Sequence, residues 1–250
     1  MHFDRPIVLS IAGLDPSAGA GLLADIKTFE QHKVYGLGIC SAQTLQTETE
    51  FLSVRWEKSA DIVTVLEKML THYEVKAVKI GIVEDISVLL KIVSAINGID
   101  KDIKIIVDPI LRSSSGFTFW KGNISESILK EVLPRIYLLT PNYDEMGLIT
   151  GQDAKSSAEE LSMYCNILLK GGHNKGEPAI DYLFMKGESD KIFPETVSFS
   201  SKHGSGCVLS SSITANLALG FELPAACRLA KNYIERFLSG SETLLGYHNV

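Results

Sequence analysis

Several features that would place the chain in a broad functional class are missing from its sequence. No apolar run approaches the roughly 20 residues that a bilayer-spanning helix needs, and the N-terminus lacks the basic-then-apolar pattern of a signal peptide. Lysine and arginine number 24 against 30 aspartates and glutamates, so a basic surface for nucleic acid is not expected. These absences predict a cytoplasmic protein without nucleic-acid or membrane partners.

Cysteine is scarce, and its spacing does not suit a metal site. The four cysteines, Cys40, Cys165, Cys207 and Cys227, lie far apart, and no CxxC pair occurs. This spacing excludes a zinc site or a disulfide framework and suits a reducing compartment.

Three common enzyme signatures are also absent. No glycine loop ends in Gly-Lys-Ser/Thr, which disfavours a nucleotide kinase with a Walker A loop. No Gly-x-Ser-x-Gly elbow of a serine hydrolase occurs. The segment 19–24 resembles the glycine-rich fingerprint of dinucleotide-binding proteins. However, Gly19 comes too late after the first predicted strand, and no acidic residue ends the second predicted strand. We therefore reject a nicotinamide site.

The residues that are present predict an α/β fold. Hydrophobic residues make up 45% of the 250, enough for a large core. β-rich runs alternate with amphipathic, helix-length stretches, which predicts a three-layer arrangement: a mostly parallel sheet with helices on both faces. Strands are expected at 7–12, 36–41, 75–80, 103–107, 135–139 and 166–169, with a hairpin of 179–185 and 191–197. Helices are expected at 22–32, around 62–73, 86–96, around Glu145, 206–219 and 224–238. No linker interrupts the pattern, so residues 1–250 are expected to form one domain.

Polar residues and glycines cluster directly after the predicted strands: Asp15, Lys79, Asp108, Asn142 and Lys170-Gly171-Gly172. In open α/β sheets, ligands bind at the carboxyl ends of the strands, so this phasing predicts a binding site at one sheet edge. Asp-Pro and Pro-Asn pairs are also common in turns and helix caps, and each pair alone is compatible with that structural role.

The segment from Lys202 to Cys207 carries the strongest local signal. Gly204 and Gly206 flank Ser205 at the predicted start of a helix, where unpaired amides and the helix dipole favour an anion such as phosphate. Cys207 would lie on the first turn, where the ordinary thiol pKa of about 8.5 can be lowered. The alternatives are an ordinary glycine cap with Cys207 in the core, or a cysteine nucleophile paired with His203.

Several of these segments together resemble the hydroxymethylpyrimidine and phosphomethylpyrimidine kinases of thiamine biosynthesis, within the ribokinase-like superfamily. The resemblance rests on Ile11 to Gly21, Ala24-Asp25-Ile26-Lys27-Thr28 and His203-Gly204-Ser205-Gly206-Cys207, and continues through Lys79-Ile80-Gly81, Asp108-Pro109, Thr140-Pro141-Asn142 with Glu145, and Lys170-Gly171-Gly172-His173. It implies a ribokinase-like fold, ATP and Mg²⁺ as cofactors, a small pyrimidine substrate and a homodimer. Pyridoxal kinases share much of the pattern but usually carry Asp at the position of Cys207.

The resemblance also implies roles for individual residues. The amides of Gly204, Ser205 and Gly206 would stabilise the transferring phosphoryl group, and Cys207 would deprotonate the substrate hydroxymethyl group. The remaining residues divide into a substrate set of Gly13, Asp25, Gln46 and Ile82, an ATP set of Asp108, Asn142, Lys170, Gly172 and His203, and a metal pair of Asn142 and Glu145.

The chain departs from the family pattern at three places. Ser114 and Phe117 stand where the family often has Lys and Asp, Ile82 replaces a common methionine, and Thr47-Glu48-Thr49 follows Gln46 in place of Asn-Thr. These departures keep two alternatives open: a pyridoxal kinase, and a catalytically weak ligand-binding protein on the same fold.

Overall fold

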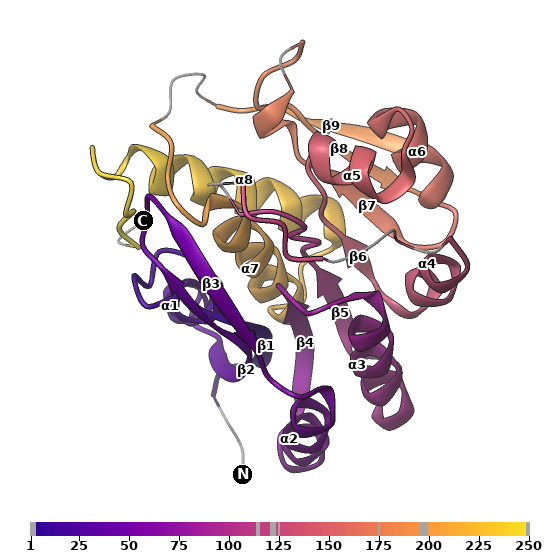
Figure 1. Ribbon diagram of the computed structural model, residues 1–250. Coiled ribbons are helices and arrows are strands. Elements are labelled where there is room, and N and C mark those ends of the chain that lie inside the picture. Colours follow the sequence, from indigo (N-terminus) through magenta and orange to yellow (C-terminus); the bar gives the residue numbers. More distant parts are fainter. Residues whose placement is uncertain are drawn as a thin grey trace.

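One sheet organises the chain, as Figure 1 shows. The computed structural model describes residues 4–113, 116–120, 124, 126–174, 176–195 and 200–248. The strands of this part are β1 (Ile7–Leu14), β2 (Tyr35–Gln46), β3 (Phe51–Trp56), β4 (Val75–Ile80), β5 (Lys104–Val107), β6 (Leu138–Leu139), β7 (Asn166–Leu169), β8 (Asp181–Met185) and β9 (Glu188–Ile192). Their order across the sheet is β3-β2-β1-β4-β5-β6-β7-β8-β9.

Strands β2, β1, β4, β5, β6 and β7 pair in parallel. The pairs β2–β3, β7–β8 and β8–β9, at the two sides of the sheet, are antiparallel. The carboxyl ends of the parallel strands therefore lie at one edge. Because β3 runs the other way, its first residues lie at that same edge.

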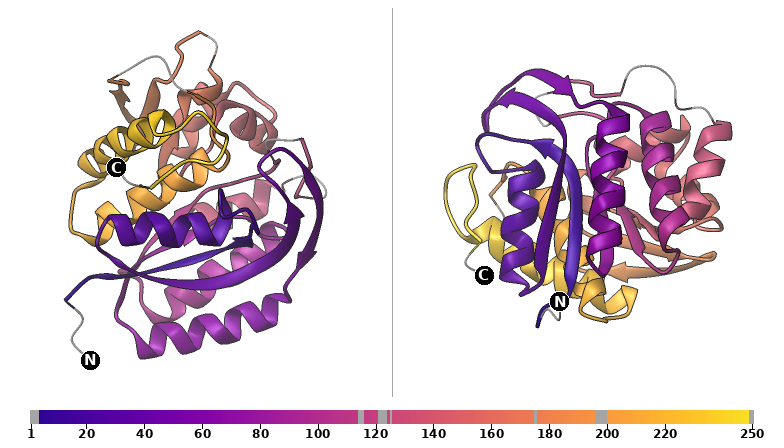
Figure 2. Two further views of the ribbon diagram at one scale, coloured as in Figure 1. Left: turned by 90° about the vertical axis from the view of Figure 1, so that its left-hand side faces the viewer. Right: turned by 90° about the horizontal axis from the view of Figure 1, so that it is seen from below.

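Helices cover both faces of the sheet, as the two views in Figure 2 show. Their bounds are α1 (Gly21–Gln31), α2 (Ser59–His72), α3 (Ile86–Ile99), α4 (Glu126–Val132), α5 (Tyr143–Thr150), α6 (Ala154–Leu161), α7 (Ser205–Ala218) and α8 (Leu223–Ser239). Two short 3-10 turns, η1 (Leu133–Arg135) and η2 (Gly171–His173), complete the described elements. The predicted α/β fold, with a mostly parallel sheet between two helical layers, is confirmed.

The side chains of β1 show how the sheet divides the core. Ile7, Leu9 and Ile11 belong to the apolar cluster shared with α2 and α3. Val8 belongs to the cluster shared with α1, α7 and α8. This period of two is that of a strand buried on both faces, where side chains alternate between the layers.

Helix α7 is buried along almost its whole length, because it lies between the sheet and the neighbouring helices α1 and α8. Small residues line it, among them the buried Ser210, Ser211 and Ser212. Small side chains let the helix approach the strands closely. They also place hydroxyl groups, which need hydrogen-bond partners, in the interior.

Several predicted boundaries need correction. The helix expected at 86–96 continues through Asn97 and Gly98 to Ile99, because its buried face packs on the sheet and Asn97 donates hydrogen bonds to the carbonyls of Val93 and Arg135. Strand β2 extends to Gln46, and β6 is shorter than expected because a 3-10 turn takes up residues 133–135. The late hairpin forms from β8 and β9, with its second strand three residues earlier than expected. Part of the predicted strand, residues 196–197, falls outside the described residues.

Candidate functional site

The first turn of α7 has backbone amides without helical partners. Gly204 is the residue before the helix, with φ of +75°, and no side chain caps the helix start. The amides of Ser205, Gly206 and Cys207 therefore have no carbonyl four residues back within the helix. Together with the helix dipole they form a site suited to an anion, as the sequence predicts.

Gly204 is glycine for two reasons. Its φ lies in the left-handed region, where other residues are strained. A Cβ built at this position would lie 2.1 Å from the carbonyl oxygen of Gly19 and 2.7 Å from Cα of Ala20. The segment that begins α7 is thus pressed against the loop that follows β1.

A buried histidine joins the same two segments. His203 Nε2 lies 2.8 Å from Asp15 Oδ2, and the same carboxylate accepts hydrogen bonds from the amides of Ser17 and Ala20. Burial raises the pKa of Asp15, but the bonds from His203 and Ser17 outweigh burial and the pKa is lowered. His203 was predicted to contact ATP. That contact stays a prediction; in the structure the His203 side chain is 8% exposed and its contact with Asp15 joins the start of α7 to the loop after β1.

A cluster of charged side chains lies beside the start of α7. Lys170 Nζ is 2.7 Å from Asp108 Oδ1 and 3.7 Å from Glu145 Oε2. A Cβ built on Gly206 would lie 3.3 Å from Lys170 Nζ. The lysine ammonium and the free amides of α7 therefore face one small volume, with the side chains of Asp108 and Glu145 beside the ammonium.

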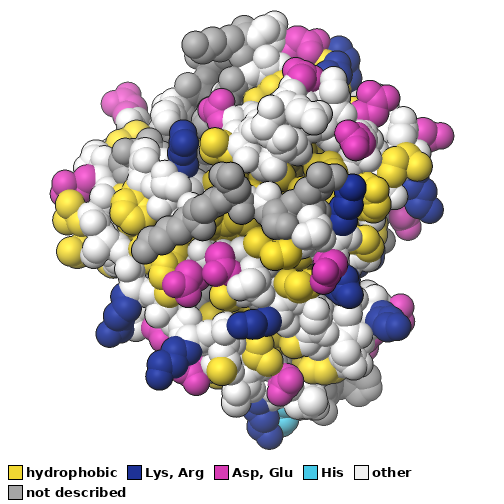
Figure 3. Space-filling view, turned by 45° about the vertical axis from the view of Figure 1, so that its right-hand side comes forward, with side chains coloured by type: hydrophobic (Ala, Val, Ile, Leu, Met, Phe, Trp, Pro, Cys, Tyr) yellow, Lys and Arg dark blue, Asp and Glu magenta, His cyan; other side chains and the backbone are white. Residues whose placement is uncertain are grey.

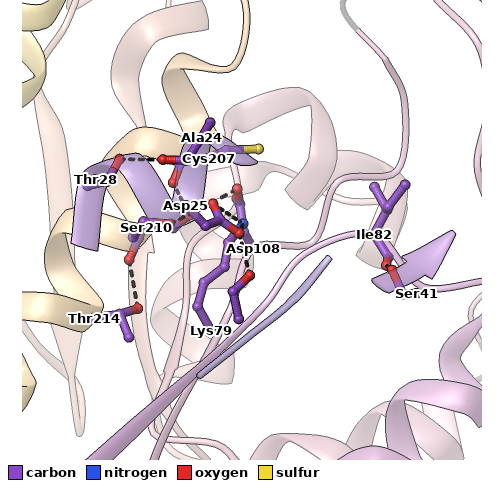
Figure 4. A network of polar contacts seen from close by, with 12 residues as sticks. Ala24, Asp25, Thr28, Ser41, Lys79, Ile82, Asp108, Cys207, Ser210 and Thr214 are labelled. Atoms are coloured by element: carbon purple, nitrogen blue, oxygen red, sulfur yellow. Dashed lines mark hydrogen bonds and ion pairs between the residues drawn. The ribbon is translucent and has the colours of Figure 1, made fainter. Parts of the chain in front are cut away.

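The carboxylate of Asp108 is fully buried and well partnered. Thr140 Oγ1 donates to its Oδ1 over 3.2 Å. Ser210 Oγ donates to its Oδ2 over 3.2 Å, and Figure 4 labels both residues of this second pair. Burial raises the pKa of Asp108, yet Lys170 and Lys79 outweigh burial and the pKa is lowered. Asp108 is therefore an anion at neutral pH and forms the ion pair with Lys170.

Asn142 and Glu145, the predicted metal pair, form a capping box at the start of α5. Asn142 Oδ1 accepts from the Glu145 amide over 2.8 Å, and Glu145 Oε2 accepts from the Asn142 amide over 2.7 Å. Burial raises the pKa of Glu145 to about 7, with Asp108 acting in the same direction against Lys170. Among the described residues, no group of three or more His, Cys, Asp or Glu side chains gathers as a metal site would. Two protein oxygens suit Mg²⁺, which is commonly held by one or two carboxylates and by substrate phosphates.

A fully buried ion pair lies on the other side of Cys207. Lys79 Nζ contacts both oxygens of Asp25, at 2.9 and 2.8 Å. Ser10 Oγ and Ser211 Oγ also donate to that carboxylate, each over 2.6 Å. Asp25 was predicted to contact the substrate. These four hydrogen bonds attach Lys79 and α7 to Asp25, and the contact of Asp25 with the substrate stays a prediction.

The thiol of Cys207 does not have the lowered pKa that its helix position predicted. Burial raises the pKa of Cys207 to about 11, and the attraction of Lys79 reverses only part of that rise. Asp108 and Asp25 act in the direction of burial. The prediction of a lowered thiol pKa is therefore wrong, because desolvation exceeds the effect of the helix terminus.

The remaining predicted substrate residues lie at the carboxyl ends of β1, β2 and β4. A Cβ built on Gly13 would lie 2.4 Å from Cδ1 of Ile82, so these two residues are in close contact. Ser41 Oγ donates to the carbonyl of Ile82 over 2.6 Å, as Figure 4 shows to one side of the charged cluster. Gln46 ends β2, and its side-chain amide donates to Thr44 Oγ1 over 2.9 Å.

A second buried ion pair supports the turn that carries Lys170 and Gly172. Lys231 Nζ of α8 lies 2.8 Å from Asp181 Oδ2, and Asp181 Oδ1 accepts from the Gly171 amide over 2.7 Å. A Cβ on Gly172 would meet nothing within 4 Å, so its backbone is open to a ligand. The sequence analysis missed Lys231 and Asp181; the signal was a lysine in the predicted apolar helix 224–238.

Comparison with known proteins assigns the chain to a family. The family model described as phosphomethylpyrimidine kinase matches residues 15–249. The chain belongs to the phosphomethylpyrimidine kinase family. Within this family, the hydroxymethylpyrimidine/phosphomethylpyrimidine kinase of Rhizobium meliloti (strain 1021) is 33% identical over 249 residues, covering 95% of this chain and 92% of the relative.

Solved structures agree with the family assignment. The crystal structure of phosphomethylpyrimidine kinase from Clostridium difficile 630 superposes with a TM-score of 0.77 at 34% identity, covering 92% of this chain and 98% of that one. An ADP complex of Bacillus subtilis pyridoxal kinase gives a TM-score of 0.81 at 24% identity, covering 97% and 96%. The second likeness shows a shared fold. The structure of this family member thus has the ribokinase-like architecture that the sequence predicts.

Proposed function

We propose that this phosphomethylpyrimidine kinase family member transfers the terminal phosphoryl group of ATP to 4-amino-5-hydroxymethyl-2-methylpyrimidine and to its monophosphate, in thiamine biosynthesis. The observation that carries the proposal is the meeting of the free amides of Gly204, Ser205 and Gly206 with the Asp108–Lys170 pair. Phosphoryl transfer needs positioning and charge stabilisation more than covalent chemistry from the protein. Charge-stabilising groups of both kinds, helix amides and a buried ammonium, meet at this point.

In the proposed mechanism, the hydroxymethyl oxygen of the alcohol attacks the γ-phosphorus of ATP in the first step. In the second step a phosphate oxygen of the monophosphate attacks it, and ADP leaves each time. The amides at the start of α7 stabilise the negative charge that develops on the transferring oxygens. Lys170 stabilises the polyphosphate, and the open backbone of Gly172 lies against the nucleotide. Asn142 and Glu145 would hold Mg²⁺, which neutralises phosphate charge when bound. Asp25, His203 and Asp15 keep the loops of the site in register.

The proposal is tested by mass detection of products from the pyrimidine alcohol and ATP. We expect the monophosphate first and the pyrophosphate second, with ADP formed in equal amounts. A parallel reaction with pyridoxal checks the alternative substrate, whose supporting relatives share the fold at lower sequence identity. Faster turnover of pyridoxal than of the pyrimidine would overturn the substrate assignment. Ligand binding without turnover, seen as a raised melting temperature, would favour a binding protein.

The role of Cys207 as the base has its own test. If the thiol takes the hydroxymethyl proton, Cys207→Ala should lower kcat about 100-fold, the usual contribution of a positioned base. Burial raises the pKa of Cys207 to about 11. Proton transfer to the sulfur therefore either occurs together with the attack on phosphorus or follows a lowering of the thiol pKa when the substrate binds. Cys207→Ser, whose hydroxyl is a much weaker acid than a thiol and does not ionise at neutral pH, should lose the rate as Cys207→Ala does. A near-normal rate for Cys207→Ala leaves the thiol as packing only.

We further propose that residues 1–250 act as one cytoplasmic domain and assemble as a homodimer. The edge strand β3 carries the exposed Leu52, and Leu45 of the neighbouring β2 is equally exposed, each at 57%. A second copy would cover these side chains. In the described part of the chain, no helix is both long and apolar enough for a membrane span. On the face in Figure 3, acidic and basic side chains are mixed, which agrees with a small-molecule substrate.

A further inference from the structure

The last described residues of the chain return to the start of α7. Residues 240–248 follow α8 and form the yellow loop beside that helix in Figure 2. The carbonyl of Leu244 in this loop accepts a hydrogen bond from the His203 amide over 2.9 Å. The loop is thereby bonded to the segment that leads into the anion site. We name residues 241–245 the C-terminal strap.

Hydrogen bonds within the loop hold the strap in one conformation. Ser241 Oγ and Thr243 Oγ1 both donate to the carbonyl of Leu245, over 3.0 and 2.9 Å. Beyond the strap, His248 Nδ1 lies 3.1 Å from the hydroxyl oxygen of Tyr233 on α8. The strap is thus closed on itself, and the residues that follow it are attached to the helix from which it departs.

The strap also touches the loop that follows β1. A Cβ built on Gly19 would lie 2.8 Å from Leu245 Cδ2 and 2.8 Å from His203 Cδ2. The carbonyl oxygen of Gly19 is the atom that a Cβ on Gly204 would approach to 2.1 Å. Gly19 is therefore packed against both the strap and the start of α7. The three segments meet at one point, directly before the free amides of the helix.

A buried lysine ties the start of α7 to the strap. Lys202 is 4% exposed and directly precedes His203. Its Nζ donates to the Ser241 carbonyl, and to Ser200 Oγ over 2.7 Å. Ser200 Oγ donates in turn to the carbonyl of Leu238, in the last turn of α8, over 2.6 Å. The ammonium thus lies at the carboxyl end of α8, where free carbonyls and the helix dipole favour a cation.

The partners of Lys202 differ from those of the other buried lysines. Lys79, Lys170 and Lys231 each pair with a carboxylate. Within the described part of the chain, Lys202 forms no ion pair, and carbonyl and hydroxyl oxygens take the place of a carboxylate. Removal of its ammonium therefore leaves no buried anion without a cation. The change detaches the start of α7 from the strap and leaves the charges of the site as they are.

We propose that the C-terminal strap, fastened by Lys202, positions the amides of residues 205–207 for phosphoryl transfer. Lys202 bonds to the strap and to Ser200, so it is a positioning residue. This inference rests on the proposed kinase function. Helix amides stabilise the charge that develops on the transferring group only when they are held at the right place. Loosening the strap therefore lowers kcat and leaves binding of the pyrimidine alcohol nearly unchanged.

Steady-state kinetics on Lys202→Met provide the first test. Methionine keeps an unbranched apolar stem and removes the ammonium. We expect kcat to fall about tenfold and KM for the pyrimidine alcohol to stay within about twofold, since a displacement of about 1 Å costs on the order of 100-fold. Lys202→Arg, which keeps the charge and the donors, should recover part of kcat. The matched control is Tyr247→Ala, whose side chain is 59% exposed just beyond the strap and which should leave kcat unchanged.

A second control separates positioning from lost stability. Leu66→Ala removes a fully buried side chain of α2, a helix outside the site, and should lower the melting temperature without lowering kcat of the folded enzyme. A kcat for Lys202→Met within twofold of the wild type, or no lower than that of Leu66→Ala, would overturn the proposal.

Leu245→Ala tests the strap independently of the lysine. It removes the contact with Gly19 and keeps Lys202 in place. We expect kcat to fall on the order of tenfold, and this result decides the proposal even if Lys202→Met does not fold. The double variant should lose no more than the larger of the two single losses, because both changes act through one strap. A normal kcat for Leu245→Ala, or losses that multiply in the double variant, would overturn the proposal.

Hydrogen exchange gives a test that does not require turnover. The amides of His203 and Val208 bond to the carbonyls of Leu244 and Gly204. Both should exchange faster in Lys202→Met than in the wild type, whereas the amides of β7 should keep their rates. Unchanged exchange at His203 and Val208 would overturn the proposal.

Failure of the strap is distinguishable from failure of the kinase function. An active wild type whose Lys202→Met and Leu245→Ala variants keep a normal kcat would overturn the role of the strap alone. A wild-type chain that makes no product would overturn the proposed function. In that case hydrogen exchange still decides whether the strap holds the start of α7, because it reports structure and not turnover.

Discussion

Gly204→Ala should abolish most of the kinase activity, with kcat reduced by about 100-fold or more. The new Cβ would lie 2.1 Å from the Gly19 carbonyl oxygen, a backbone atom, so either the loop after β1 or the start of α7 must move. Displacement of catalytic groups by about 1 Å can lower a rate on the order of 100-fold. The left-handed φ of +75° adds a stability loss of about 1–3 kcal/mol. Steady-state kinetics and thermal unfolding of the variant measure the two effects separately.

Two other glycines separate the causes of that loss. Gly220→Ala imposes a left-handed φ of +92° with nothing within 4 Å, so it should destabilise the fold without changing kcat. Gly98→Ala adds a methyl group inside α3, also in open space, and should stabilise the protein by about 0.5–1 kcal/mol. A Gly204→Ala variant that loses no more activity than Gly220→Ala would contradict the assignment of the anion site to the start of α7.

Lys79→Met should destabilise the protein by about 3–5 kcal/mol, because it leaves the Asp25 carboxylate buried without its cation. Both side chains of the pair have no exposure to solvent. Burial lowers the pKa of Lys79, but Asp25 outweighs burial and the pKa is raised, so the lysine is charged in the folded state. The free energy of unfolding, from urea titration at neutral pH, measures the loss.

The double variant Lys79→Met with Asp25→Asn provides the matched comparison. It removes both charges while Ser10 and Ser211 keep a polar partner at position 25, so it should be more stable than Lys79→Met alone. If the double variant is as unstable as the single one, the loss comes from packing around Lys79 and not from an unpaired charge. Arg228→Ala, which breaks an exposed ion pair with Asp190, should change stability by less than about 1 kcal/mol.

The fold was predictable where burial and local signals agree. Strands β4 and β7 begin and end as predicted. In both, an apolar run is flanked directly by polar residues or glycine, which specifies the position and the length of the strand. Strand β3 was missed because none of its residues is fully buried: Leu52, Ser53 and Arg55 are exposed and the other three are half-buried. Its pairing with β2 is a tertiary interaction. The end of α3 was also misplaced, because its packed face outweighs the weak helix propensity of Asn97 and Gly98.

The sequence predicts which loops come together at the site. Positions after β1, β4, β5 and β6 come together with the start of α7, since parallel strands end at one edge. The role of each side chain at the site could be predicted less well from the sequence. The sequence does not show that Asp25 is fully enclosed by Ser10, Lys79 and Ser211, because that depends on a contact 186 residues away along the chain. The direction of the Cys207 pKa shift depends likewise on complete burial.

The link between Lys231 and Asp181 has a consequence for how this family can diverge. An ammonium on α8 and a carboxylate on β8, 50 positions apart, stabilise the turn of Gly171. Among the described residues, neither charge forms an ion pair with any other group. A lineage that replaces one of them leaves the other as an isolated buried ion, which is strongly unfavourable. The two positions should therefore change together among descendants, as a pair inherited jointly or lost jointly.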